Sequence, residues 1–352
     1  MSNSNKLNDN SWTNKINNIG LQRLLSLGAL VILYVLFSIF GRNFLSLSTL
    51  INILDSSYYI GFLAIGVTFV IITGGIDLSI GTVMMCSTLL GGVAYNVWGW
   101  PIGLCLIFLI FCSTLFGLFN GILVAKFKLP PFIATLGTML ISMGLGSIIA
   151  KVSTQRYPTS FEADGWFKTV FFKTQSGFPT GVIFLLIFLV IAIIILNKTR
   201  LGRYTFAMGS NEEAVRLSGV RVDKWKIGVY VISGFYAGLS GIVYASAYTT
   251  IIPGTGNGLE LLAIAAVVIG GTSLSGGVGS IVGTMIGVFI MSVLSNGLMS
   301  MNLQGQWQTF FTGIVVICAV LLDLYRNKKS NEVKFEKNEK ESKTSELPVN
   351  LK

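Results

Sequence analysis

Long apolar runs separated by short polar segments occupy most of this chain, and they constrain its fold more than any other feature. Ten runs approach the roughly twenty residues that an α-helix needs to cross a bilayer. They lie at about 24–40, 56–73, 78–95, 102–124, 131–149, 180–196, 227–248, 259–271, 277–298 and 308–324. Only 11% of the 352 residues are charged, whereas soluble domains carry roughly 25%. The sequence therefore predicts an all-α, polytopic membrane protein with about ten transmembrane helices.

Two of these runs are too short for a straight crossing, and both end in paired glycines. The run at 56–73 meets Gly74 and Gly75, and the run at 259–271 ends in Gly270 and Gly271. We expect broken or partly re-entrant helices at both places. The sequence around the first break recurs weakly around the second, at an offset of about 199 residues. Paired glycine breaks in two halves of a transporter point to its substrate path, and close helix packing is the alternative explanation.

Other glycine motifs are better explained by helix packing alone. Small residues four positions apart let two membrane helices approach closely. Such motifs occur at Gly117 to Gly121, at Gly234 to Gly238 and from Gly279 to Gly287. We expect these glycines to lie at helix contacts.

The basic residues predict the orientation of the chain. With an even number of crossings, one side of the membrane collects 20 of the 25 lysines and arginines, among them those of the loop at about 198–226. By the positive-inside rule this side is the cytoplasm, and both termini lie there. The domain organisation follows: a disordered cytoplasmic leader at 1–20, a transmembrane domain at 21–326, and a disordered cytoplasmic tail at 327–352 that is rich in Lys, Glu, Asn and Ser.

Composition excludes several classes of function. The chain has no histidine, and its four cysteines are scattered through apolar runs without the paired spacing of a metal site. No metal centre, disulfide framework or enzyme active site is therefore expected. The net charge of +10 lies beside hydrophobic spans, so the orientation rule explains it without nucleic-acid binding.

Two apparent nucleotide-binding motifs lack the context that such motifs need. Leu274 to Gly277 reads Leu-Ser-Gly-Gly, but no lysine-bearing P-loop occurs in the chain. The spaced glycines at 254, 256 and 258 follow no predicted strand of a βαβ unit. We expect the chain itself to bind no ATP and no other cofactor.

Two carboxylates, Asp77 and Glu260, stand at span edges close to the two glycine breaks. Carboxylates within a membrane are functional by default, but each also lies where it can cap the helix that follows. Both roles stay open from the sequence. The candidate path and gating residues are Gly74, Gly75, Asp77, Ser79, Glu260, Gly270, Gly271 and Ser273.

The loop at about 198–226 contains a short amphipathic segment of mixed charge. Asn211 is a helix-capping residue, two glutamates follow it, and Gly219 ends the segment. This order predicts a short helix. Such a helix held against the membrane is either a docking element for a soluble partner or a structural juxtamembrane helix.

Here the chain resembles a known family. The loop, Thr73 to Ser79, Pro131 to Gly137, and the Gly270 to Gly279 stretch are similar to motifs of permease subunits of bacterial ATP-binding-cassette (ABC) sugar importers, in the ribose, galactose, arabinose and xylose group. The likeness covers about residues 20–326 and is strongest to ribose permeases.

The resemblance implies a multi-pass permease in the bacterial cytoplasmic membrane. It implies three partners besides lipid: a second permease subunit, identical or sibling, a cytoplasmic ATPase that uses the ATP, and a periplasmic sugar-binding protein that selects the cargo. The loop then couples to the ATPase, and the glycine breaks line or gate the path. The implied coupling residues are Gly209, Asn211, Glu212, Glu213, Ala214, Arg216 and Gly219.

One position departs from the family pattern. Leu262 stands in Glu260-Leu261-Leu262 where the family frequently has Asp, so no role of that Asp transfers to this chain. The alternative to an ABC permease is an ion-coupled secondary transporter of a small polar solute. The absence of histidine leaves such a carrier with few ionisable groups for proton relay.

Overall fold

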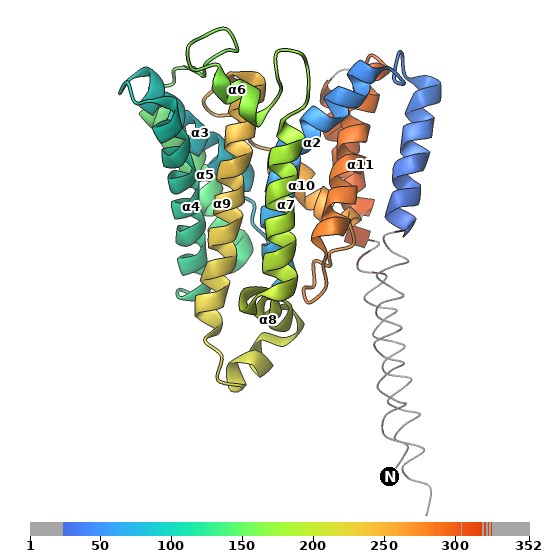
Figure 1. Ribbon diagram of the computed structural model, residues 1–352. Helices are drawn as coiled ribbons and strands as arrows, with labels where there is room; N and C mark the ends of the chain where they lie inside the picture. The colour runs from blue at the N-terminus through green and yellow to red at the C-terminus, as the bar shows by residue number, and fades with distance from the viewer. Residues whose placement is uncertain (1–23, 304, 319, 322, 324, 326–352) are drawn as a thin grey trace, which may run out of the picture.

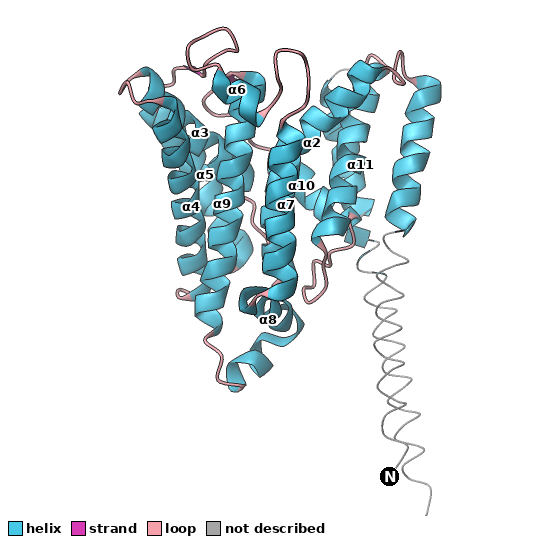
Figure 2. Cartoon of the chain, in the orientation of Figure 1, coloured by secondary structure: helices cyan, strands magenta, loops and turns pink. Residues whose placement is uncertain are grey.

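The computed structural model describes residues 24–303, 305–318, 320, 321, 323 and 325, which form one helical bundle (Figures 1 and 2). The predicted leader at 1–20 and tail at 327–352 lie outside the described residues. The all-α prediction is confirmed for the described part, which contains only one two-stranded sheet, β1 with β2.

Helices follow one another through short connections. A helix at Leu24–Phe40 comes first, and helical residues at 305–318 come last. Between them lie α2 (Leu47–Ile72), α3 (Ile80–Asn96), α4 (Ile102–Ala125), α5 (Pro131–Ile149), β1 (Gln155–Arg156), α6 (Trp166–Phe171), α7 (Gly181–Lys198), α8 (Arg200–Leu217), α9 (Val222–Tyr248), β2 (Thr250–Ile251), α10 (Leu259–Ile269) and α11 (Ile281–Ser300).

Six of the described helices are long and apolar enough to cross a membrane, namely α2, α4, α5, α7, α9 and α11. Three further apolar helices are shorter: the first helix, α3 and α10. A helix of 17 residues spans about 25 Å, which is less than the roughly 30 Å of hydrocarbon. The length and apolar composition of these helices thus indicate a membrane protein. The count of ten crossings stays a prediction.

The prediction of a short helix before Gly74 is wrong. α2 begins at Leu47 and has 26 residues, so it is long enough to cross the bilayer. The first turns of α2 were not predicted from the sequence, because Asn52, Asp55 and two serines interrupt the apolar run. The Asp55 carboxylate forms an ion pair of 2.8 Å with Lys173, which lets a charged residue lie within this helix. The other short helix is confirmed, since α10 has only 11 residues.

The bundle has two ends (Figure 1). α6 and the two short strands lie at one end, and α8 lies at the other; we call them the α6 end and the α8 end. α2 occupies the centre, packed against α7, α9, α10 and α11, and 89% of its most apolar window is buried. In contrast, α7 lies at the rim with only 22% of its window buried.

Glycines bring α4 and α9 into backbone contact, which confirms the packing prediction. A Cβ on Gly117 would lie 2.4 Å from the Tyr230 carbonyl oxygen, and one on Gly234 would lie 2.5 Å from the Ser113 carbonyl oxygen. Both distances are far below normal contact. The α10 to α11 contact is built in the same way, because a Cβ on Gly287 would lie 1.9 Å from the Ala266 carbonyl oxygen.

We therefore expect Gly234→Ala to lower the stability of the purified protein by about 1–3 kcal/mol, since the added methyl group meets backbone that cannot move alone. Gly137→Ala is the matched control. Gly137 is also helical, but a Cβ there meets nothing within 4 Å, so alanine is expected to stabilise by about 0.5–1 kcal/mol. Thermal unfolding in detergent measures both. Equal melting temperatures for the two variants would refute the packing role of Gly234.

Candidate functional site

The two glycine breaks are the same structure: each is a helix C-terminus closed by a Schellman motif. At the end of α2, Gly74 N–H donates to the Ile71 carbonyl (2.9 Å) and Gly75 N–H to the Val70 carbonyl (3.2 Å). At the end of α10, Gly271 N–H and Thr272 N–H make the equivalent bonds, of 2.9 and 3.2 Å. Gly74 and Gly271 have φ of +77° and +92°, which glycine adopts without steric cost. The sequence repeat therefore corresponds to a repeated local structure.

Both breaks also pack closely against other parts of the chain. Gly75 is buried, and a Cβ there would lie 2.9 Å from the Tyr230 hydroxyl. A Cβ on Gly270 would lie 2.3 Å from the Gly283 carbonyl oxygen of α11. In each pair, therefore, one glycine (Gly74 or Gly271) makes the turn and the other (Gly75 or Gly270) allows the close packing.

α8 reaches the end of α2 through Gly209. The segment 272–279, which follows α10, returns to α2, and its Gly277 N–H donates to the Ile72 carbonyl at 2.8 Å. A Cβ on Gly209 would lie 1.8 Å from that same Ile72 oxygen and 2.4 Å from the Gly277 nitrogen. Gly276, with φ of +83°, lies between Gly209 and Gly74. The end of α2, the segment after α10 and α8 therefore meet backbone to backbone at the α8 end.

Beyond Gly209, α8 bends at Asn211, whose φ of −164° and ψ of 98° are not helical. The Asn211 Oδ1 accepts the Ala214 N–H at 2.9 Å and so caps a second, short helix. Gly219 follows this helix with φ of +82°. The helix predicted between Asn211 and Gly219 is confirmed. The preceding helical residues from Arg200, in what the sequence suggested was a loop, were not predicted.

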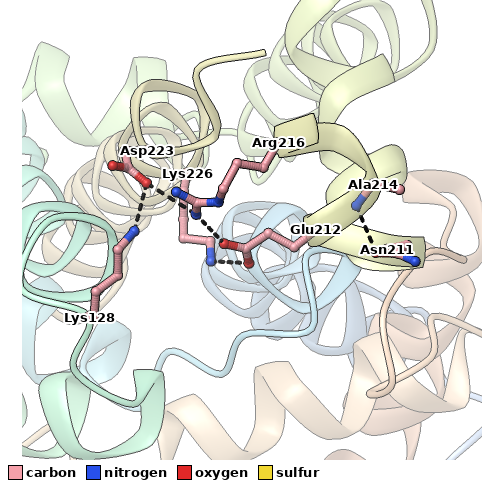
Figure 3. A network of polar contacts seen from close by, with 7 residues as sticks. All are labelled: Lys128, Asn211, Glu212, Ala214, Arg216, Asp223 and Lys226. Atoms are coloured by element: carbon pink, nitrogen blue, oxygen red, sulfur yellow. Dashed lines mark hydrogen bonds and ion pairs between the residues drawn. The ribbon is translucent and has the colours of Figure 1, made fainter. Parts of the chain in front are cut away.

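A chain of ion pairs fixes this short helix to its neighbours (Figure 3). Lys128, between α4 and α5, pairs with Asp223 of α9 at 2.8 Å, and Asp223 lies 3.6 Å from Arg216. Arg216 pairs with Glu212 at 3.1 Å, and Glu212 also pairs with Lys226. Partial burial would raise the pKa of Glu212, but the bonds from Lys226 and Arg216 outweigh it and hold that pKa below its usual value of 4.5. The charged groups of Glu212 and Arg216 thus form ion pairs with other residues of the same chain.

The exposed surface of the short helix is made by other residues. Asn211, Glu213, Ala214, Arg216 and Gly219 are exposed. Leu217 stands out, with 80% of its surface accessible. An apolar side chain this exposed beside charged residues is available for contact with a partner. We did not single out Leu217 from the sequence, where its one signal is its place in the last turn before Gly219.

Asp77 lies inside the subunit, in a polar network between helices. Its carboxylate, 2% exposed, accepts the Ser79 N–H (3.0 Å), the Ser79 hydroxyl (2.7 Å) and the Ser233 hydroxyl (2.9 Å). The Asn120 amide donates to the Ser79 hydroxyl at 2.8 Å, and the Thr138 hydroxyl donates to the Asn120 carbonyl oxygen. This arrangement joins the start of α3 to α4, α5 and α9. Asp77 and Ser79 are therefore buried in contacts between helices, and Ser79, the N-cap residue of α3, makes no side-chain cap hydrogen bond.

Glu260 is buried in the first turn of α10. Its Oε1 accepts the Gly258 N–H at 2.8 Å, while its buried Oε2 has no hydrogen-bond partner among the described residues. A Cβ on Gly81, in the first turn of α3, would lie 2.6 Å from that Oε2. The starts of α3 and α10 thus flank this carboxylate, where the positive ends of both helix dipoles favour its charge.

The sequence-based site residues fall into two groups in the structure. Gly209, Gly74, Gly75, Gly270 and Gly271 lie at or next to the contact at the α8 end. Ser273 lies in the same segment, and its hydroxyl donates to Asp323 at 3.1 Å. Asp77, Ser79 and Glu260 lie apart from that contact. The role of Ile72, Gly276 and Gly277 in it was missed, although the Gly276–Gly277 pair was a visible signal of a tight turn.

A bundle of apolar helices, six of which among the described residues are long and apolar enough to cross a bilayer, defines a polytopic membrane protein. Comparison with known proteins identifies the family: residues 49–320 match the family described as branched-chain amino acid transport system / permease component. The chain belongs to this permease family, which confirms the resemblance found in its motifs. The family is one of transport permeases, not of enzymes.

Individual relatives extend over most of the chain. It is 39% identical to the ribose import permease protein RbsC of Escherichia coli (strain K12) over 308 residues, which cover 86% of this chain and 93% of RbsC. It is 35% identical to the fructose import permease protein FrcC of Rhizobium meliloti, over 82% of this chain and 81% of FrcC. It is 34% identical to the autoinducer 2 import system permease protein LsrC of Yersinia pestis (strain Pestoides F), over 84% and 82%.

Gly209→Ala tests the contact at the α8 end. Alanine is the better helix former, so any loss comes from packing against Ile72 and Gly277, at about 1–3 kcal/mol. We expect a lower melting temperature and loss of transport. Gly137→Ala, made in parallel, should not lower the melting temperature and should retain transport. Wild-type transport by the Gly209 variant would show that α8 does not depend on this contact.

Glu212→Gln tests the ion-pair chain. Exposed pairs contribute about 0.2–1 kcal/mol each, so we expect a small fall in stability at low salt that disappears at high salt. Glu213→Gln is the control, since Glu213 is exposed and forms no ion pair among the described residues. Because the folded pKa of Glu212 is lowered, its contribution is present at neutral pH and is lost as the pH falls through that pKa. An equal effect of both variants, unchanged by salt, would count against the network.

Proposed function

We propose that this chain is the permease subunit of an ATP-driven ABC importer that translocates a monosaccharide across the bacterial cytoplasmic membrane. The names of the relatives support a small polar cargo, chiefly ribose and fructose. The observation that carries the proposal is the contact of Gly209 with the end of α2 and with Gly277 in the segment that follows α10. It joins an exposed helix at one end of the bundle to the interior through backbone alone.

Charge supports the orientation. Among the described residues, the α8 end holds Lys126, Lys128 and the seven cations from Lys198 to Lys226, whereas the α6 end holds Arg42, Lys151, Arg156, Lys168 and Lys173. The positive-inside rule then places the α8 end in the cytoplasm. Both termini lie on that side in this proposal, and α8 faces a cytoplasmic ATPase. A binding protein docks at the α6 end, and a second permease subunit completes the path.

The proposed mechanism follows from the packing. Docking of the ATPase on Glu213, Ala214 and Leu217 holds the short helix, and the ion pairs of Glu212 and Arg216 keep it fixed to α9. Movement of α8 then displaces the end of α2 and the segment 272–279 together, because Gly209 leaves no space between them. The Schellman turns at Gly74 and Gly271 are the pivots. Cargo selection belongs to the binding protein, so the permease alone is expected to have no high-affinity sugar site.

The direct test is uptake by proteoliposomes that contain this chain with and without its ATPase and its binding protein. Labelled ribose, fructose, galactose, arabinose and xylose are the cargoes. Uptake that requires all three components and ATP would establish the importer and name its sugar. Uptake by this chain alone, driven by a proton or sodium gradient, would refute the proposal and favour a secondary transporter with Glu260 as the coupling group.

Leu217→Asp is expected to weaken binding of the ATPase about tenfold to a hundredfold, since a buried leucine contributes about 1.5–3 kcal/mol. Leu217→Met, which keeps the apolar contact, should bind and transport normally. Co-purification of the ATPase and stimulated ATP hydrolysis are the measurements. If the Asp variant retains both, the partner does not cover Leu217.

A further inference from the structure

An irregular segment, residues 252–258, links β2 at the α6 end to α10. Its three glycines, Gly254, Gly256 and Gly258, have φ of +76°, +103° and +96°. Residues other than glycine rarely adopt such left-handed conformations. The left-handed conformations at alternate positions therefore explain the Gly-x-Gly-x-Gly spacing. The three glycines thus allow a non-helical backbone between β2 and α10.

The segment reaches hydrocarbon depth. A Cβ on Gly256 would lie 2.8 Å from the Gly81 carbonyl oxygen and 2.5 Å from the Met85 side chain, so Gly256 lies against the first turns of α3. From there α3 runs 17 residues toward the α6 end, about 25 Å, and α10 runs 11 residues toward the α8 end, about 16 Å. A position this far from both ends lies within a hydrocarbon core of about 30 Å.

After the exposed Ile252 and the half-buried Pro253, the segment is polar and open to the outside of the subunit. Gly254, Thr255 and Asn257 are exposed. Within the described part of the chain, the backbone N–H groups of residues 254–257 have no assigned hydrogen-bond partner. The Thr255 hydroxyl donates to the Ile252 carbonyl, and the Asn257 amide makes no assigned bond there.

Such a surface does not fit lipid. Non-helical backbone at membrane depth is tolerated only where protein buries it or where it lines a water-filled cavity. The two intramembrane carboxylates do not open outward, since Asp77 and Glu260 are 2% and 3% exposed. The exposed polar groups of residues 254–257 are the Asn257 amide, the Thr255 hydroxyl and backbone groups, all uncharged.

We propose that residues 252–258 form one wall of the aqueous translocation path and that Thr255 and Asn257 hydrogen-bond the hydroxyl groups of the sugar in transit. The second permease copy supplies the facing wall, so the site is incomplete in one subunit. An uncharged amide both donates and accepts hydrogen bonds, which suits a neutral polyhydroxylated cargo and binds it weakly enough to release it. The identity of the cargo rests on the proposed function; water access to the segment does not.

Cysteine accessibility tests the path. Asn257→Cys and Thr255→Cys are each made in the full complex in proteoliposomes. The background chain has Cys112 and Cys318 replaced by alanine, because these two are accessible, whereas Cys86 and Cys105 are buried and are kept. A membrane-impermeant, charged thiosulfonate is the probe. Ile187→Cys on the rim helix α7, at a position that is 52% exposed, is the lipid-facing control. We expect both path variants to react at least about tenfold faster than the control, as a hydrated thiolate does.

Two results would overturn the proposal. One is labelling no faster than at Ile187. The other is disulfide formation between Asn257→Cys residues of two copies without labelling, which would make the face a dry subunit contact. Labelling reports water access even if every sugar tested fails in uptake, so failure here is distinguishable from failure of the proposed function.

Sugar contact is tested separately. Asn257→Leu should lower uptake at least about tenfold, the effect of losing about 1.4 kcal/mol of transition-state stabilisation, with assembly and ATP hydrolysis retained. Asn257→Gln, which keeps the amide, should recover part of the uptake. Unchanged uptake by the leucine variant would remove Asn257 from the path.

Discussion

The last carbonyl groups of α2 set the architecture of the α8 end. A helix that ends inside a membrane protein leaves backbone carbonyls without partners, and neither lipid nor apolar side chains can supply them. Here Gly74 and Gly75 close two of them, and Gly277 N–H, brought back from the far side of α10, closes the Ile72 carbonyl. The turn at Gly276 and Gly277 serves this requirement, and Gly209 of α8 packs against the bond that results. The contact of α8 with the end of α2 is therefore built on hydrogen-bond completion.

Hydropathy and glycine spacing predicted what depends on local sequence. The helix after Asn211 followed from its cap and its terminal glycine, and the α4 to α9 contact followed from Gly117 and Gly234. The start of α2 was missed because Asp55 interrupts the apolar run, and only its pairing with the distant Lys173 makes that charge tolerable. An ion pair between residues more than a hundred positions apart cannot be recognised from the local sequence.

The candidate site shows the same division. The glycines of the two breaks were recognisable from their repeat, yet nothing in the sequence showed that Gly209 meets the end of α2 and Gly277. Glu212 and Arg216 looked like partner-facing charges, and the structure uses them for ion pairs that include Lys226 and reach Lys128 through Asp223. Leu217 was overlooked because one apolar residue in a charged segment has no periodicity. Exposure, which decides its role, is a property of the fold.

The bend at Asn211 divides α8 into two parts under different constraints. Before it, Gly209 touches backbone on two sides and tolerates no side chain. After it, Glu213, Ala214 and Leu217 touch little of their own subunit. In the proposed importer, substitutions in the second part would therefore change the surface offered to the ATPase without disturbing the packing of the first. A few surface substitutions would then be enough to fit a different ATPase, without rebuilding the membrane domain.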